Sequence, residues 1–290
     1  MRYAFVKRHS TRSYPVRFLC EICKVSSSGY YEWLSRKESA RSRENRALTV
    51  QIRALFEESD STYGAIRIRR ELKKQGAKCG KNRVARIMRK ESLVSVHRKK
   101  FHPCTTNSKH RLPVAPNIVS QDFSASAPNE KWGGDISYIP TGEGFLYLAV
   151  ILDFFSRRVV GRAAGDSLES SLCCNALNMA LLRRNPPSKL IHHSDRGVQY
   201  ASAAYTKILR ENNFTQSMSR TGNCYDNAMV ESFFHTLKVE RVNRRNYQTK
   251  KKALDDITDY IENWYNKKRS HSSLDYVSPT EYENQYQLAA

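Results

Sequence analysis

The sequence predicts an α/β protein, in which a mixed five-stranded sheet with flanking helices is preceded by a helical, helix-turn-helix-like region. Two observations predict this order. Apolar residues recur at helical spacing up to about residue 90, whereas short apolar segments typical of strands begin near residue 131. Three of these segments, 132–139, 145–152 and 157–163, follow one another closely, as in an antiparallel meander. Helices then alternate with strands at 189–193 and 214–218, which adds parallel pairs and helices on both faces.

The first hundred residues are predicted to hold two helical parts, an N-terminal helical segment over 1–42 and a helix-turn-helix-like domain over 43–100. Helices are expected at 44–58, 65–76 and 81–90 within the second part. The last of them has one apolar face and one basic face, and the basic face carries Arg83, Arg86, Arg89 and Lys90. A basic helix can be merely a solvated surface, but a basic third helix also suggests contact with DNA.

The charge of the chain is concentrated in its front half. Residues 1–127 contain 28 Lys and Arg against 10 Asp and Glu, whereas residues 128–290 contain 21 against 18. Clustered positive charge predicts a nucleic-acid partner. An anionic membrane is a poorer candidate, because no amphipathic helix with a bulky apolar face accompanies the charge. The longest apolar run is too short to span a bilayer, and no secretory signal is visible, so we expect a cytoplasmic protein.

The remaining boundaries follow from composition. Residues 101–127 are rich in Pro, Ser, Thr and Asn and predict a linker. Residues 128–245 contain the predicted sheet and its helices, and they form the predicted core domain. Residues 246–290 are expected to form a C-terminal helix, at 250–267, and then a basic, polar tail.

Three acidic residues occupy positions where an acid is costly unless it is used. Asp135 lies within a predicted strand, Asp195 ends another, and Glu231 lies on a helix beside its apolar stripe. Carboxylates that crowd together repel one another unless a cation lies between them, and hard divalent cations prefer oxygen ligands. Each acid taken alone would be an ordinary surface residue. Asp153 also follows an apolar strand, but it is not assigned to a metal.

A resemblance to a known family joins these residues. Asp195 and Glu231 are separated by 35 residues, and the neighbouring stretches include STYGAIRIRRELKKQG, NEKWGGDISYI, HSDRGVQY and SMSRTGNCYDNAMVESFFHTLKVE. This pattern resembles the D,D-35-E signature of DDE transposases and retroviral integrases. More narrowly, the chain is similar to the second-reading-frame product of the insertion sequence three family of bacterial transposases, from about residue 14 to residue 284.

The resemblance implies an RNase H-like catalytic core in which Asp135, Asp195 and Glu231 are both the catalytic residues and the metal ligands. The implied cofactor is a pair of Mg²⁺ ions, for which Mn²⁺ can substitute. The implied reaction is cleavage and transfer of DNA strands by direct in-line attack. Lys238 matches a basic residue of the family that contacts DNA near the active site.

Two further residues are expected to support the site. His193 matches the family's His two residues before the second Asp, and it could orient a ligand or water or make a structural hydrogen bond. Asn227 belongs to a loop, residues 222–227, that is expected to shape the site.

The resemblance also sets the expected partners. These are double-stranded DNA, as element ends and target, further copies of the same chain on DNA, and the upstream-frame product; no membrane partner is expected. The implied location is the bacterial nucleoid. Since no heptad run is visible, the chain could be the catalytic frame alone. Two alternatives stay open, a non-enzymatic DNA-binding regulator of the fused transposase and a nuclease that does not join strands.

Overall fold

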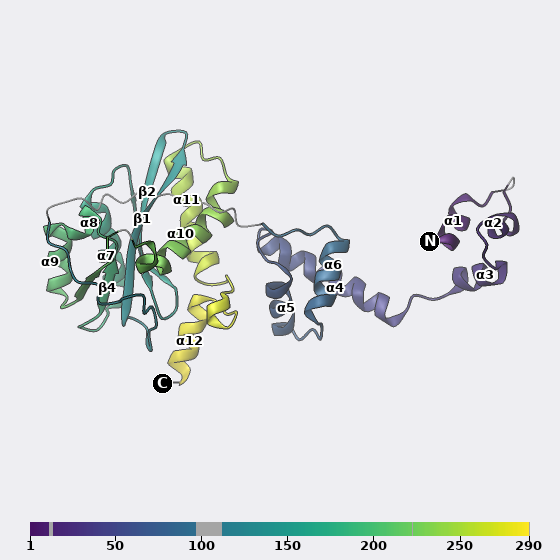
Figure 1. Ribbon diagram of the computed structural model, residues 1–290, viewed down its shortest axis with the longest axis horizontal. Helices are drawn as coiled ribbons and strands as arrows, with labels where there is room; N and C mark the ends of the chain where they lie inside the picture. The colour runs from purple at the N-terminus through teal and green to yellow at the C-terminus, as the bar shows by residue number, and fades with distance from the viewer. Residues whose placement is uncertain (12–13, 97–111, 222, 290) are drawn as a thin grey trace. The chain divides into compact units, whose positions relative to one another are not determined.

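The computed structural model describes residues 1–11, 14–96, 112–221 and 223–289. The described chain divides into two compact units, Met1–Ala54 and Leu55–Ala290, shown in Figure 1. The boundary therefore falls inside a helix, some twelve residues after the one expected at 42/43.

The first unit contains three short helices and most of a fourth. They are α1 (Arg2–His9), α2 (Val16–Ile22), α3 (Ser27–Ser35) and α4 (Ala40–Glu58). Ser26 caps α3 by accepting a hydrogen bond from the amide of Gly29 at 3.3 Å. The chain therefore turns before Ser26, and Gly29 is already helical.

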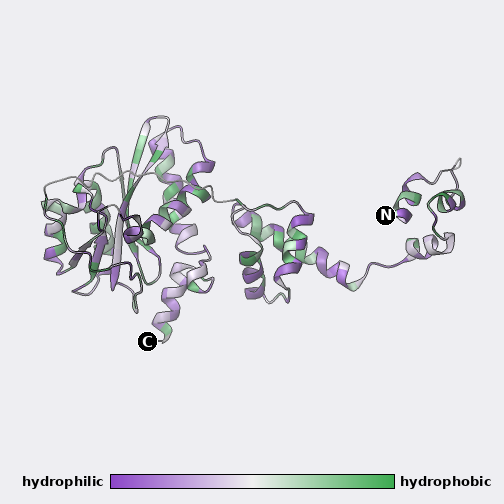
Figure 2. Cartoon of the chain, in the orientation of Figure 1, coloured by the Kyte–Doolittle hydropathy of each residue, from purple (hydrophilic) through white to green (hydrophobic). Residues whose placement is uncertain are grey.

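Two amphipathic helices begin the second unit. They are α5 (Ala65–Lys74) and α6 (Lys81–Lys90), which contact each other. Gly76 follows the end of the first of them with a left-handed φ of 84°, which glycine adopts without strain. Figure 2 shows hydrophilic and hydrophobic residues alternating around both helices, and the buried ones are Ile68, Leu72, Val84, Ile87 and Met88.

A five-stranded mixed sheet forms the centre of the second unit. Its strands are β1 (Lys131–Thr141), β2 (Gly144–Asp153), β3 (Val159–Gly165), β4 (Ile191–Ser194) and β5 (Thr215–Met218). The order across the sheet is β3-β2-β1-β4-β5. The first three strands pair antiparallel, whereas β1 with β4 and β4 with β5 pair parallel. The predicted meander followed by parallel units is confirmed.

Helices cover both faces of this sheet (Figure 1). One layer consists of α7 (Ser170–Arg184), α8 (Val198–Ala201) and α9 (Ala203–Glu211), and the other contains α10 (Ala228–Glu240) and α11 (Lys250–Asp259). Strand β2 supplies both cores by alternation, since Leu148 and Val150 pack with α10 and α11, whereas Ala149 and Ile151 pack with α7. No helix of the described residues is long and apolar enough to cross a membrane.

The predicted linker is not a linker throughout. Residues 97–111 lie outside the described residues, but residues 112–127 pack on the sheet domain. Val119 is 2% exposed within the core of α10 and α11, and the amides of Ile118 and Val119 donate to Ser217 Oγ on β5. The polar composition predicted a linker, but backbone amides of this segment donate to the sheet domain instead of to water.

The predicted basic, polar tail is wrong. Residues 270–290 contain no Lys or Arg, and the described part is folded into a short 3₁₀ turn, η4 (Ser272–Leu274), and helix α12 (Pro279–Ala289). Glu283 is 3% exposed, where it accepts hydrogen bonds from Ser156, Arg158 and Arg184 at 2.6–2.9 Å. These buried pairs attach the C-terminal helix to the sheet domain.

Candidate active site

Two of the predicted carboxylates lie at adjacent parallel strands, Asp135 within β1 and Asp195 directly after the end of β4. Gly134 on β1 is paired with Ser194 at the end of β4, so Asp135 and Asp195 are the next residues on the two strands. Neighbouring strands lie about 5 Å apart. Asp195 Oδ1 accepts a hydrogen bond from the amide of Gly197 at 2.8 Å, which fixes one carboxylate oxygen where the strand gives way to a turn.

Helix α10 brings the third carboxylate to the same face of β1. A side chain at Gly133 would meet Val230 Cγ2 of this helix at 2.6 Å, so glycine permits the close approach of helix and strand. Glu231 follows Val230 and is exposed in the first turn of the helix. Its neighbours Phe233, Phe234 and Leu237 are buried, which confirms the predicted apolar stripe. The paired glycines in WGGD were a signal that the sequence reading did not use.

The three carboxylates act on one another electrostatically. Burial raises the pKa of Asp135 well above its usual value, and the charge of Asp195 and then that of Glu231 raise this pKa further. The Ile136 amide, which donates to Asp135 Oδ1 at 2.8 Å, and the Lys238 ammonium oppose the rise in pKa. Burial also raises the pKa of Glu231, with Asp195 as the second cause. A positive charge near Asp135 would therefore favour its ionised form.

The donor chemistry of this cluster fits a hard divalent cation, since all three side chains offer carboxylate oxygens. Within the described residues, no group of three or more His, Cys, Asp or Glu side chains is close enough together to hold an ion as it stands. Repulsion between bare carboxylates favours such an open arrangement.

Lys238 lies in the last turn of α10, seven residues after Glu231. Its Nζ is 4.6 Å from the centre of the Tyr138 ring, a cation–π contact. Burial lowers the pKa of Lys238, and the negative charge of Asp135 partly offsets that shift. A half-buried cation thus lies close enough to Asp135 for their charges to interact.

His193 has no ring nitrogen free for a ligand. Nδ1 lies 2.8 Å from Ser217 Oγ on β5, and Nε2 lies 2.8 Å from the carbonyl oxygen of Asp226. Burial lowers the pKa of His193 to about 4, so the ring is neutral near pH 7. The structure favours a structural hydrogen bond over orientation of a ligand, the two roles that the sequence left open for this residue.

The loop before α10 is organised by a residue that the sequence reading underrated. Asp226 is 0% exposed and accepts hydrogen bonds from Asn117, Gln121 and Arg220 at 2.8–3.0 Å. These bonds, led by those from Arg220, lower its pKa. Asn227, the next residue, is buried at the start of α10. Gly222, which belongs to the same predicted loop, lies outside the described residues.

Asp153 is a structural residue, in agreement with its exclusion from the metal ligands. Its carboxylate is completely buried and accepts hydrogen bonds from the amides of Asn129 and Phe155 and from the Trp132 indole at 2.8–3.3 Å. Arg184 lies 3.6 Å away. These donors join the carboxylate to the ends of the strands, so its oxygens already accept hydrogen bonds from the protein.

Comparison with known proteins identifies the family of the chain. Residues 125–224 and residues 231–286 each match a family described as an integrase core domain, and residues 42–101 match the HTH-like domain family. The chain is 40% identical over 286 residues to "Transposase InsF for insertion sequence IS3A" of Escherichia coli (strain K12), which covers 98% of this chain and 99% of that protein. The chain belongs to the IS3 family of transposases.

Two other similarities were found. The transposase is 41% identical over 273 residues to "Insertion element IS600 uncharacterized 31 kDa protein" of Shigella sonnei, covering 94% of this chain and 100% of that one. Among solved structures, the HTLV-2 integrase catalytic core domain in complex with magnesium aligns with a TM-score of 0.44 and 15% identity, over 55% of this chain and 99% of that chain.

The basic face predicted for the helix-turn-helix-like domain of the transposase lies on α6. Arg86, Arg89 and Lys90 are exposed and Arg83 is partly exposed, whereas the opposite face is buried. The side chains thus lie where a phosphate backbone could reach them.

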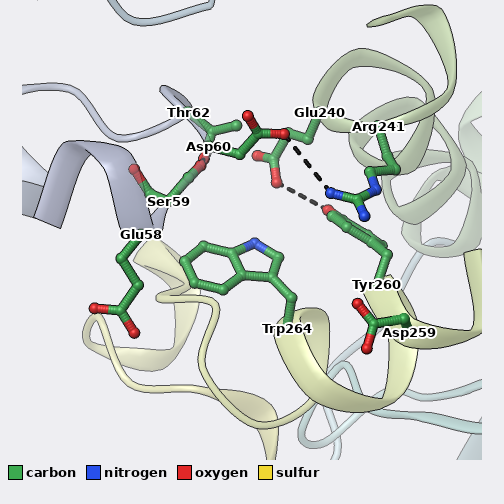
Figure 3. Close-up of a pocket in the computed structure, with 9 residues that line it drawn as sticks. All are labelled: Glu58, Ser59, Asp60, Thr62, Glu240, Arg241, Asp259, Tyr260 and Trp264. Atoms are coloured by element: carbon green, nitrogen blue, oxygen red, sulfur yellow. Dashed lines mark hydrogen bonds and ion pairs between the residues drawn. The ribbon is translucent and has the colours of Figure 1, made fainter. Parts of the chain in front are cut away.

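A buried ion pair fixes the other end of the catalytic helix. Glu240 accepts from Arg269 Nε at 2.8 Å and from Nη2 at 2.6 Å, and Tyr260 donates to the same carboxylate at 2.8 Å. Figure 3 shows Glu240 and Tyr260 at a cavity of about 180 Å³ between α10 and the 58–62 loop that precedes α5. Asp60 of that loop pairs with Arg241, Arg244 and Arg245. These contacts attach the helix-turn-helix-like domain to α10.

Proposed function

We propose that this transposase cuts and joins DNA strands at a site where Asp135, Asp195 and Glu231 hold two divalent cations, Mg²⁺ or, in its place, Mn²⁺. The observation that supports this proposal is the mutual effect of the carboxylates, since the charges of Asp195 and Glu231 both raise the pKa of Asp135. Three acids from three separate elements repel one another electrostatically, and a shared cation would remove this repulsion.

The residues of the chain would divide the work by position. When bound, the cations would activate the attacking hydroxyl and stabilise the leaving oxygen of the phosphodiester. Asp135 and Asp195 are set by strand backbone, so they hold their places while Glu231 closes from the helix. Lys238 would contact a DNA phosphate next to the reacting one. His193 and Asn227 would support the loop that carries α10.

The proposed ligand is duplex DNA, both as the ends of the element and as the target. Arg83, Arg86, Arg89 and Lys90 on α6 would contact its phosphates. We also propose that at least two copies act together on paired ends in the nucleoid, and that the upstream-frame product is a further partner. The basic face of α6 and the excess of Lys and Arg in residues 1–127 support DNA as the ligand.

A strand-transfer assay tests the chemistry. The chain is incubated with Mg²⁺ and DNA that carries a pre-cut 3′ end of the element, and joined products are measured. We expect Asp195→Asn to lose at least a thousandfold in joining, on the scale of about 4 kcal/mol of lost transition-state stabilisation. The matched control is Asp255→Asn, an exposed acid on α11, which should join DNA at the rate of the unaltered chain.

The assay also separates the alternatives. Joining that persists in Asp195→Asn would reject the proposed site. DNA binding without cleavage under Mg²⁺ or Mn²⁺, with the upstream frame restored, would instead identify a regulator. Cleavage without joining of a pre-cut end would identify a nuclease.

A further inference from the structure

The N-terminal cluster of helices α1–α3 carries an arrangement that the matched families do not describe. The HTH-like domain match begins at residue 42, after α3 has ended at Ser35. The three helices nevertheless have a core of their own, formed by Val6, Leu19, Cys20 and Tyr30. An independent core of this kind in a strongly basic segment calls for a functional explanation.

The link between α2 and α3 has the form of a helix-turn-helix. Four residues, 23–26, separate Ile22 from Ser27, and a turn of three or four residues is typical of this motif. Lys24 has a left-handed φ of 53°, and the amide of Val25 donates to the carbonyl of Cys20 at 3.0 Å. This bond closes the end of α2, and Ser26 then caps α3 directly.

Packing fixes which face of α3 is turned inward. Tyr30 is 3% exposed, and Trp33 packs against the same core from the next turn. Gly29 lies against the Tyr3 hydroxyl of α1, where a Cβ would collide with it. Cys20 is a small buried residue on α2. The inner face of α3 is therefore held by both other helices, and the orientation of its outer face is set.

The outer face of α3 presents groups that can read base edges. Ser28, Tyr31, Glu32 and Ser35 are all exposed, and Tyr31 keeps 56% of its surface accessible. Serine hydroxyls can donate to or accept from bases, and a glutamate can accept from the amino group of cytosine. The outer face has no large aliphatic residue except Leu34 at its edge, so it is mainly a hydrogen-bonding surface.

The charge around this face matches a phosphate backbone. Residues 1–36 contain 7 Lys and Arg against 2 Glu, a net charge of +5. Arg17 in the first turn of α2 and Lys24 in the turn are exposed. In helix-turn-helix proteins the first helix of the pair crosses the backbone while the second enters the major groove. Exposed apolar residues such as Phe18 and Ile22 lie on α2 and would suit a protein partner, but the charge favours DNA.

We propose that helices α1–α3 form a second helix-turn-helix, in which α3 enters the major groove of duplex DNA and Arg17 and Lys24 contact its phosphates. The inference rests on the proposed function only in taking DNA as the ligand. It gives the chain two DNA-reading modules, this one and the HTH-like domain, so that each element end would be contacted at two places by one copy.

The experiment measures binding of the full chain to a duplex that carries one end of the element, by fluorescence anisotropy in EDTA, so that no chemistry takes place. Ser28→Glu places a negative charge on the outer face of α3 and should weaken binding about tenfold or more. The control, Ala40→Glu, adds the same charge at an exposed site at the start of α4 and should bind within about twofold of the unaltered chain. Arg17→Gln should lower the slope of log Kd against log salt by about 1.

Circular dichroism spectra must match those of the unaltered chain before the affinities are compared. Unchanged affinity and salt slope in folded Ser28→Glu and Arg17→Gln would overturn the proposal. The same is true if Ser28→Glu leaves DNA binding intact but dissociates a complex between copies, because the face would then bind protein. Asp195→Asn should bind as tightly as the unaltered chain, so that a failure of the catalytic proposal is seen separately.

Discussion

Replacing Arg269 by Met should destabilise the second unit by about 3 kcal/mol, because it leaves the carboxylate of Glu240 buried without its partner. Glu240 is 8% exposed and Arg269 is 3% exposed, and two hydrogen bonds of 2.8 and 2.6 Å join them. Removing one partner of a buried pair costs about 3–5 kcal/mol. We choose the lower end because the Tyr260 hydroxyl would remain bonded to Glu240 at 2.8 Å.

The pH dependence gives this prediction a second signature. In the unaltered chain, burial alone would raise the pKa of Glu240, but Arg269, Tyr260 and Arg67 together outweigh it and the net pKa is lowered, with Arg269 as the strongest of the three. That contribution to stability is present above the unfolded pKa and is lost as the pH falls. Without Arg269, burial should raise the pKa of Glu240. The protonated carboxyl is then the form that suits the fold, so its contribution to stability is present below the unfolded pKa and is lost as the pH rises. The difference between the two proteins should therefore shrink towards pH 4.

Urea unfolding followed by circular dichroism measures the loss at pH 7 and at pH 4.5, and amide hydrogen exchange along α10 shows where it occurs. Glu240→Leu combined with Arg269→Met should recover most of the stability, because apolar replacements remove the buried charge. Lys207→Met, which breaks an exposed pair with Glu211, should cost no more than about 0.5 kcal/mol. A loss below about 1 kcal/mol in Arg269→Met at pH 7 would refute the reasoning.

Three other predictions follow from the site. Gly133→Ala should cost about 1–3 kcal/mol in urea unfolding and slow joining, because its Cβ would collide with the Phe154 ring and with Val230 of α10, whereas Gly165→Ala makes only an ordinary contact at 3.4 Å. The folded pKa of His193 is about 4, so the fold favours the neutral ring, and the stability gained from this is lost as the pH falls from 6.5 to 4. This loss amounts to at most about 3 kcal/mol in the unaltered chain. His193→Gln should remove this part of the pH dependence of unfolding. Lys238→Met should reduce the rate of joining about tenfold or more, with a proportionally smaller change in the free energy of unfolding. Lys267→Met, at an exposed position, should leave both the joining rate and the free energy of unfolding unchanged.

Each of these has a contrary result that would count against the structure. Equal joining rates in the two glycine variants would show that the approach of α10 to β1 is not limiting. An unchanged pH profile for His193→Gln would place a different group in the acid transition. Full joining activity in Lys238→Met would remove this lysine from the proposed DNA contacts.

Periodicity predicted the strands and helices of the sheet domain well, because each buried element repeats apolar residues at its own spacing. It also placed Glu231 beside the stripe of Phe233 and Leu237, which the structure confirms. The fold of the C-terminal residues was missed because their burial depends on a partner far along the chain, as when Glu283 meets Arg158 and Arg184. Such pairs leave no local pattern in the sequence.

The supporting residues of the site were predicted less fully than its carboxylates. Spacing marks the acids because the chemistry needs them, but the role of Asp226 comes from donors that lie about a hundred residues earlier, on Asn117 and Gln121. The division at Ala54 was likewise hidden, because α4 runs through the boundary as one continuous amphipathic helix.

The bonds to Asp226 have a practical consequence for dissecting this enzyme. A catalytic fragment cut at residue 128, where composition suggests that the domain begins, would lose Val119 from the core and remove both amide donors from a fully buried carboxylate. Such a fragment would be prone to aggregate and would report poor activity for reasons unrelated to the metal ligands. A fragment that starts near residue 112 keeps Val119 and both amide donors, so it is the better catalytic fragment to purify.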